Sequence, residues 1–226
     1  LNGNNKVFRI SNPDSAATGN YDQTHPSTPA LVKIGETGSG GTPGTFSFSF
    51  GFKSASGSVQ NGLQIDVTPF ESGTASRHGI LRFKDDETNG FSVGWWETDD
   101  TGDFNFITLA TGMSRDKWHN VSVDMSFVDG EDNDLVSIDI DLNGSPIHAG
   151  TWEGYYRTAG GDQPVLAPVD SVIFRISTGG GPEGGGVYFD NIATTSAPIP
   201  LPPSMAMTLM GLVGVGGFGW LRRRRS

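Results

Sequence analysis

Between Thr45 and Lys53, phenylalanine alternates with serine or glycine, and this alternation constrains the fold more than any other feature of the chain. Successive side chains of a β-strand point to opposite faces, so the pattern predicts a strand with one buried face. The same period of two recurs at 63–67, 121–127, 136–142 and 172–176. Shorter strands are predicted at 7–10, 31–34, 80–83, 91–96, 104–109 and 187–193.

Segments rich in glycine and aspartate separate the predicted strands, and no stretch before residue 198 keeps a helical apolar period. Helices are therefore expected to be short turns at most. We predict an all-β domain over residues 1–195, built as a two-sheet antiparallel sandwich. Residues 196–226 differ in composition and form a separate tail.

The charge balance excludes one large class of function. The chain has a net charge of −10, and its four terminal arginines contribute +4, which leaves −14 for the remainder. Phosphate contacts require a basic surface, so a nucleic-acid-binding protein is excluded. There is no cysteine, so the core must hold the fold without disulfides. Leu1 is not an initiator methionine, and we expect an export signal to have been removed or to lie upstream.

The tail has three parts in a fixed order. A proline cluster is followed by an uncharged segment, 204–221, and then by a cluster of arginines. A helix of this length reaches ~27 Å, close to the roughly 30 Å of a bilayer core, so a single transmembrane helix is predicted. The arginines would hold its end on the cytoplasmic side. The residues that define the two flanking parts are Pro200, Leu201, Pro202, Arg222, Arg223, Arg224 and Arg225.

This tripartite tail resembles the PEP-CTERM sorting signal of bacterial surface proteins, with Pro200-Leu201-Pro202 at the place of Pro-Glu-Pro. The resemblance implies export, membrane anchoring and cleavage by an exosortase-type protease near the proline motif. Two alternatives stay open: a plain membrane tail, and a sortase signal. The sortase pattern would fall on 201–205, where its Thr-Gly pair does not match.

A second resemblance covers most of 45–195. The stretches that carry it are Thr45 to Phe50, Phe91 to Trp95, Trp118 to Val123, Ile138 to Gly144 and Gly186 to Ile192. Their succession is similar to the concanavalin A-like lectin/glucanase jelly roll, closest to its laminin G-like branch. That family includes lectins, carbohydrate-binding modules, hydrolases and lyases, so the resemblance implies a jelly roll without deciding the function.

No catalytic residue is predicted. Retaining glycosidases need two carboxylates about 5 Å apart, and the nearest candidate, Asp139-Ile140-Asp141, lacks glutamate at either end. The catalytic sets of the related lyases are not recognisable, and a Gly-x-Ser-x-Gly elbow is absent from the sequence. The domain is therefore expected not to be an enzyme. The alternative is a polysaccharide-acting hydrolase or lyase of the same fold.

Candidate glycan contacts cluster after the Asn143-Gly144 turn. Trp152, Tyr155 and Tyr156 would stack on sugar rings from a loop. The alternative is that they cover one open end of the sandwich. Trp95 and Trp96 are adjacent, so one is expected in the core and the other outside.

Trp118 and His119 are adjacent in the sequence, and each has an expected position in the fold. Trp118, which precedes a buried strand, is expected in the core. His119 is expected at a strand edge, because the nearby sequence offers no acid or second histidine to pair with it.

The last predictions concern aspartates. The hairpin that joins 118–127 to 135–142 is expected to place Asp124 opposite Asp139 or Asp141, with Arg175 or a cation offsetting the repulsion. The jelly-roll resemblance implies a structural calcium ion at Asp190.

Together these features predict an exported bacterial surface or extracellular-matrix protein with a non-catalytic, glycan-binding sandwich. Its expected partners are the processing protease, the membrane and an exopolysaccharide. A purely structural, tail-anchored surface protein is a further alternative.

Overall fold

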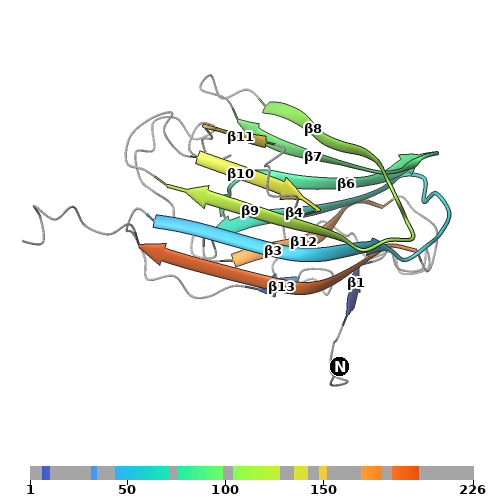
Figure 1. The fold of residues 1–226 in the computed structure, drawn as a ribbon, viewed down its shortest axis with the longest axis horizontal. Helices are drawn as coiled ribbons and strands as arrows, with labels where there is room; N and C mark the ends of the chain where they lie inside the picture. Colours follow the sequence, from blue (N-terminus) through green and yellow to red (C-terminus); the bar gives the residue numbers. More distant parts are fainter. Residues whose placement is uncertain are drawn as a thin grey trace, which may run out of the picture.

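The structure is a computed structural model that describes residues 7–10, 32–34, 44–71, 76–98, 104–127, 135–141, 148–151, 169, 171–179 and 185–198. These residues form two antiparallel sheets that lie face to face as two layers (Figure 1). The predicted all-β, two-sheet sandwich is therefore confirmed. The described residues contain no helix, and so none that is long and apolar enough to cross a membrane. The tail beyond Pro198, with its proposed membrane segment and arginines, lies outside the described residues.

The six strands of sheet A follow one another across the sheet in an order that differs from their order in the chain. They are β1 (Phe8–Ile10), β13 (Val187–Pro198), β3 (Gly44–Ser54), β9 (His119–Ser126), β10 (Leu135–Ile140) and β11 (His148–Thr151). Sheet B has the order β2 (Val32–Ile34), β12 (Ser171–Gly179), β4 (Leu63–Glu71), β6 (Ile80–Glu87), β7 (Gly90–Thr98) and β8 (Phe104–Met113), with the short β5 (Ser76–Arg77) beside β4.

The phenylalanine strand lies in the middle of sheet A and fills the core. All four phenylalanines of β3 are buried, whereas Ser47 and Ser49 face outward. Phe50 meets Phe174 of sheet B edge to face at 5.4 Å, and Phe52 meets Phe83 at 4.6 Å. Such pairs add about 0.5–1.5 kcal/mol each beyond the area they bury. The alternation that predicts this strand thus also supplies the contacts that join the two sheets.

Every predicted strand is present, and two short strands, β5 and β11, were not predicted. The predicted hairpin strands are present and pair antiparallel as β9 and β10, but the predicted register is wrong. Asp124 lies opposite Ser137, and Asp139 lies opposite Ser122, so the expected pair of facing carboxylates does not form. Arg175, proposed to offset that pair, lies on β12 of the other sheet. Since like charges opposite one another are destabilising, the observed register avoids the need for a bound cation.

Candidate functional site

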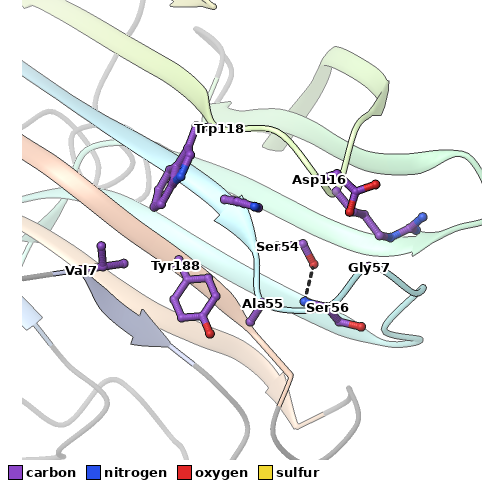
Figure 2. A pocket seen from close by; sticks show the side chains of 10 residues that line it. Val7, Ser54, Ala55, Ser56, Gly57, Asp116, Trp118 and Tyr188 are labelled. Carbon is purple, nitrogen blue, oxygen red and sulfur yellow. Dashed lines mark hydrogen bonds between the residues drawn. The ribbon is translucent and has the colours of Figure 1, made fainter.

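An open cavity of about 410 Å³ lies on the outer face of sheet A, where β3 ends and β9 begins. Figure 2 shows Trp118 and Tyr188 on its two sides, with Val7 beyond Tyr188. The loop that follows β3 and the turn that precedes β9, which includes Asp116, close one end. The cavity therefore combines the sheet surface with two connecting segments.

Strand register places a row of four large side chains along this face. Arg9 of β1 pairs with Tyr188 of β13, and Tyr188 pairs with Lys53 of β3. Phe52 pairs with His119, so Trp118 occupies the next position, opposite Lys53. Phe52 and Phe189 mark the opposite, inward face, because they pair with each other and lie in the core. Cation and aromatic residues thus alternate along the row, which we call the cation–aromatic row.

Trp118 is 43% exposed, so the prediction that it lies in the core is wrong. Its ring lies over Gly51 of β3, where a Cβ atom would be 3.5 Å from Trp118 Cε3. That distance is an ordinary van der Waals contact, so the indole lies close to the surface of the sheet. The alternation of this strand predicts an exposed Trp118. Val121 and Val123 face inward, so Trp118, at an even-numbered position, faces outward.

His119 is buried, and the expectation that it is an unpartnered strand-edge residue is also wrong. Its Nδ1 lies 3.0 Å from Asp141 Oδ2, and its Nε2 donates a hydrogen bond of 2.9 Å to the carbonyl oxygen of Ser114. The hairpin brings Asp141 to this position, although the two residues are 22 positions apart. His119 therefore fixes the turn from Ser114 to Trp118 against the sheet.

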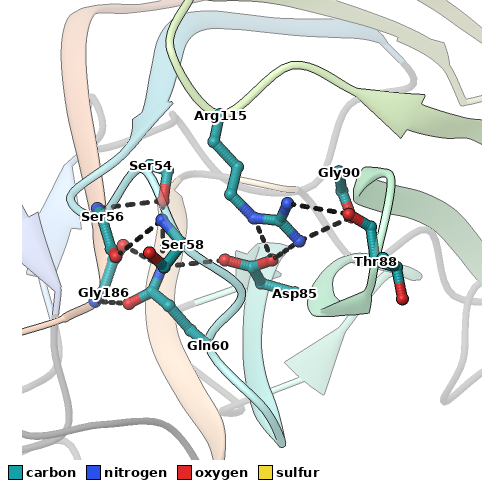
Figure 3. A network of polar contacts seen from close by, with 9 residues as sticks. All are labelled: Ser54, Ser56, Ser58, Gln60, Asp85, Thr88, Gly90, Arg115 and Gly186. Carbon is teal, nitrogen blue, oxygen red and sulfur yellow. Dashed lines mark hydrogen bonds and ion pairs between the residues drawn. The ribbon is translucent and has the colours of Figure 1, made fainter.

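A buried polar network supports the other wall of the cavity (Figure 3). The side-chain amide of Gln60 donates to Ser54 Oγ at 3.0 Å, to Asp85 Oδ2 at 2.9 Å and to the carbonyl oxygen of Gly186 at 3.0 Å. Asp85 is fully buried and accepts a bond of 2.8 Å from Arg115 Nε. The network connects the loop after β3, the strand β6 and the turn before β9, so it holds both connecting segments in place.

Arg115 lines the cavity, but its charge is already balanced by Asp85, with the two side chains 2.6 Å apart. Lys53 differs in this respect. Among the described residues, the side chains of Lys53, Tyr188 and Trp118 form no hydrogen bond or ion pair. An ammonium group, a phenol and an indole therefore line one open cavity without a bonded partner in the described part of the chain.

The outer face of sheet B also carries cations, but these are engaged with their neighbours. Asp66 is fully buried and pairs with Arg82 at 2.8 Å and with Arg175 at 3.0 Å. Arg82 also lies over the ring of Trp96, with 5.4 Å between Cζ and the ring centroid. Lys84 lies 5.3 Å from the ring centroid of Phe106. Trp95 is buried while Trp96 faces outward, as predicted.

None of the sequence-predicted binding residues is among the described residues that line the cavity. Trp152, Tyr155 and Tyr156 lie outside the described residues, as do the proline and arginine positions of the tail. Asp190 is on the outer face of β13, where its Oδ1 accepts a bond of 2.8 Å from the backbone N–H of Asn191. No group of three acidic or histidine side chains that would hold a metal occurs among the described residues. The calcium ion expected at Asp190 stays a prediction.

Comparison with known proteins identifies the sandwich as a jelly roll. Neither a protein-family model nor a curated protein matches the sequence. Among solved structures, alginate lyase AlyC3 in complex with dimannuronate has a TM-score of 0.51 at 9% identity, covering 86% of this chain and 75% of that chain. The polysaccharide lyase family 18 protein aly-SJ02 has a TM-score of 0.48 at 12% identity, covering 88% and 91%. Alginate lyase PA1167 from Pseudomonas aeruginosa has a TM-score of 0.47 at 15% identity, covering 69% and 66%.

At these identities the likeness shows the fold alone, and it confirms the jelly-roll architecture. It also corrects one prediction from the sequence. The domain was expected not to be an enzyme because no catalytic motif is recognisable, but alginate lyase AlyC3, which shares its fold with a TM-score of 0.51, is an enzyme. The absence of a sequence motif was therefore not a sound reason to exclude catalysis.

Proposed function

We propose that this protein is a lyase that binds and cleaves an acidic polysaccharide at the cation–aromatic row of sheet A. The observation that carries the proposal is the set of three side chains, Lys53, Tyr188 and Trp118, with no bonding partner among the described residues. Lys53 and Tyr188 are half-buried and Trp118 is 43% exposed, so a ligand on this face can reach all three side chains. An unpaired ammonium and phenol beside an exposed indole are the groups that a charged sugar requires.

Each group has a separate task in the proposed reaction. Lys53 binds the carboxylate of a uronate residue and stabilises the negative charge that develops when the adjacent C–H bond breaks. Trp118 holds a neighbouring sugar ring by its apolar face. The Tyr188 oxygen takes the proton from C5 as the C4–O bond breaks and the C4=C5 double bond forms. The phenol then returns this proton to the departing oxygen.

The residues of the cavity favour a lyase over a hydrolase. A hydrolase of glycosidic bonds requires two carboxylates that flank the bond. Among the described residues that line the cavity, Asp116 is the one carboxylate. Elimination needs a cation and a proton-transfer group instead, and Lys53 and Tyr188 supply these on directly paired positions of β3 and β13. The dimannuronate bound by AlyC3 is a uronate, which supports an acidic substrate.

The test is the release of an unsaturated uronyl product from a panel of acidic polysaccharides, followed by ultraviolet absorbance. Tyr188→Phe removes the hydroxyl but keeps the ring, and we expect it to lower kcat by about 100-fold or more. Lys53→Met is expected to raise KM, because it removes the carboxylate contact, and to lower kcat, because the developing charge loses its cation. Lys84→Met is the matched control on sheet B and should leave both constants unchanged.

Two results would contradict the proposal. One is the absence of product from every acidic polysaccharide with the wild-type protein. The other is full activity of Tyr188→Phe, which would assign the chemistry to a different group.

We also propose that the protein is exported and sorted to the bacterial surface by its tail, with cleavage near Pro200-Leu201-Pro202 by an exosortase-type protease. The support is the order of the proline motif, the uncharged segment 204–221 and the arginine cluster. Mass spectrometry of the mature protein from its host tests this. Loss of everything after about residue 203 is the expected result, and an intact arginine end would leave a plain anchor.

Two smaller proposals from the sequence have tests of their own. Trp152, Tyr155 and Tyr156 would extend the sugar-binding surface, and substituting them should weaken glycan binding. A calcium ion at Asp190 would be lost with a chelator, which should lower the melting temperature.

A further inference from the structure

We propose that the cation–aromatic row selects a uronate chain whose linkages are equatorial, so that its carboxylates recur on one side at every second sugar. This inference rests on the proposed function of the same site and adds the linkage geometry of the substrate. It depends on the order Arg9, Tyr188, Lys53 and Trp118 along four adjacent positions of sheet A. In this order, the two cations are separated by one aromatic residue.

The spacing of the row follows from the sheet. Neighbouring strands are ~4.8 Å apart, so Arg9 and Lys53, two strands apart, originate about 10 Å from each other. In an extended chain of pyranose rings with equatorial 1,4-linkages, each ring advances by roughly one strand spacing and is turned over relative to the last. Substituents therefore point to the same side at alternate rings. Carboxylates of rings one and three would meet Lys53 and Arg9, while ring two would lie over Tyr188.

Carboxylates beside the cation–aromatic row favour one orientation of the sugar chain relative to the strands. One step along the strands, about 7 Å away, the outward positions are Asp190 and Gly51, which pair, and Asn120, which pairs with Gly51. Asp141, 51% exposed, donates its backbone N–H to the carbonyl oxygen of Asn120 and adds a second carboxylate at this level. A polyanion that ran along β13 would meet Asp190, and one that ran along β9 would pass beside Asp141. Across the strands it meets cations, so the chain should bind at right angles to β3.

The test compares oligomers of equal length and charge that differ in linkage. The probes are mannuronan oligomers, which are linked equatorially, and guluronan oligomers, which are linked axially. Binding to the full-length protein is measured by calorimetry, with the Tyr188→Phe variant to prevent turnover. We expect mannuronan trimers and longer oligomers to bind about tenfold more tightly than guluronan, because both charge-assisted contacts form at once.

A second comparison uses chain length and a matched control. Arg9→Met should weaken binding of the mannuronan trimer but leave the dimer unchanged, because a dimer has no second carboxylate on the same side. Lys53→Met should weaken both, and Lys84→Met neither.

The outcomes separate this inference from the proposed function. Equal affinity for the two uronans, preference for guluronan, or an equal effect of Arg9→Met on dimer and trimer would overturn the linkage inference while the lyase proposal stands. If neither uronan binds and no acidic polysaccharide is cleaved, both fail.

Discussion

At the scale of single residues, Trp118 shows how an aromatic side chain can contact a sheet and still be exposed. The indole lies over Gly51 of β3, and it keeps 43% of its surface exposed. An aromatic residue so exposed contributes little to folding, since surface substitutions usually change stability by less than about 0.5 kcal/mol. It provides instead an apolar ring surface in the same cavity as the Lys53 ammonium group.

Trp118→Ala should therefore weaken uronate binding by about tenfold at most, the equivalent of one aromatic contact of 0.5–1.5 kcal/mol. Its free energy of unfolding should change by less than about 0.5 kcal/mol. Calorimetry and urea denaturation measure the two effects. Phe106→Ala is the control, because Phe106 is 37% exposed on the outer face of sheet B and its loss should not affect binding. Equal loss of binding in both variants would remove Trp118 from the site.

Gly79 is a glycine that the core requires. Its φ is +82°, and a Cβ would lie 2.3 Å from the Trp95 ring, which is fully buried. Gly79→Ala should lower the free energy of unfolding by about 2 kcal/mol or more, through backbone strain and displacement of Trp95. Gly57→Ala is the control, since its nearest neighbour would be at 3.6 Å. A neutral Gly79→Ala variant would show that the ring moves without cost.

At the scale of elements, the cavity depends on segments that have no regular structure of their own. Ser54 Oγ accepts the backbone N–H of Ser56 at 3.1 Å, and Gln60 joins the same loop to Asp85 on β6. Arg115 completes the network from the turn before β9. The sequence predicts the strands on each side because they alternate, but the network depends on polar contacts between distant positions, which have no local pattern.

Removal of the cation from this network should be costly. Arg115→Met leaves the buried Asp85 carboxylate without its charged partner, and we expect a loss of about 3–5 kcal/mol in the free energy of unfolding. Arg115→Met combined with Asp85→Leu should restore part of this loss, because the buried charge is gone. Guanidinium denaturation provides the measurement. If the double variant were less stable than the sum of the single effects, the charge would not be the cause.

The elements that the sequence does not predict lack the feature on which strand prediction depends. Residues 76–77 are a two-residue strand, and 148–151 read His-Ala-Gly-Thr, without alternation of apolar and polar side chains. The alternation of apolar and polar residues also does not predict the register between β9 and β10. Alternation fixes which face each residue occupies, yet several registers satisfy the same alternation. Hence the predicted opposition of Asp124 to Asp139 or Asp141 was wrong, although both strands were correct.

At the scale of the whole molecule, a negatively charged protein is proposed to bind a negatively charged polymer. The net charge is −10, so a uronate chain is repelled at long range and attracted only near the row. Salt screens this long-range repulsion, with a Debye length of about 30 Å at 0.01 M and about 8 Å at 0.15 M. The association rate should therefore rise with salt, by up to about tenfold between these concentrations.

Stopped-flow tryptophan fluorescence with a mannuronan oligomer measures that rate. A rate that falls with salt would mean that the local positive charge of the row dominates the approach, contrary to this expectation. The Lys53→Met variant is the reference for the long-range repulsion, because it lacks the local attraction. Its association rate should rise with salt as steeply as that of the wild type or more steeply.

The site itself could not be predicted from the sequence, even though its fold could. Arg9, Lys53, Trp118 and Tyr188 are far apart in the chain and meet only through the pairing of β1, β13, β3 and β9. The sequence marks aromatic clusters such as Trp152 to Tyr156 because they are local. A site assembled from one residue per strand leaves no local signal, and its detection requires the register of three strand pairs.

The most direct test of this account is a crystal structure of Tyr188→Phe with a bound mannuronan tetrasaccharide. The account predicts a sugar chain across β1, β13 and β3, with one carboxylate at Lys53 and a ring against Trp118. A chain bound instead over Arg82 and Trp96 on the outer face of sheet B would contradict it, and would place the function of this jelly roll on the opposite sheet.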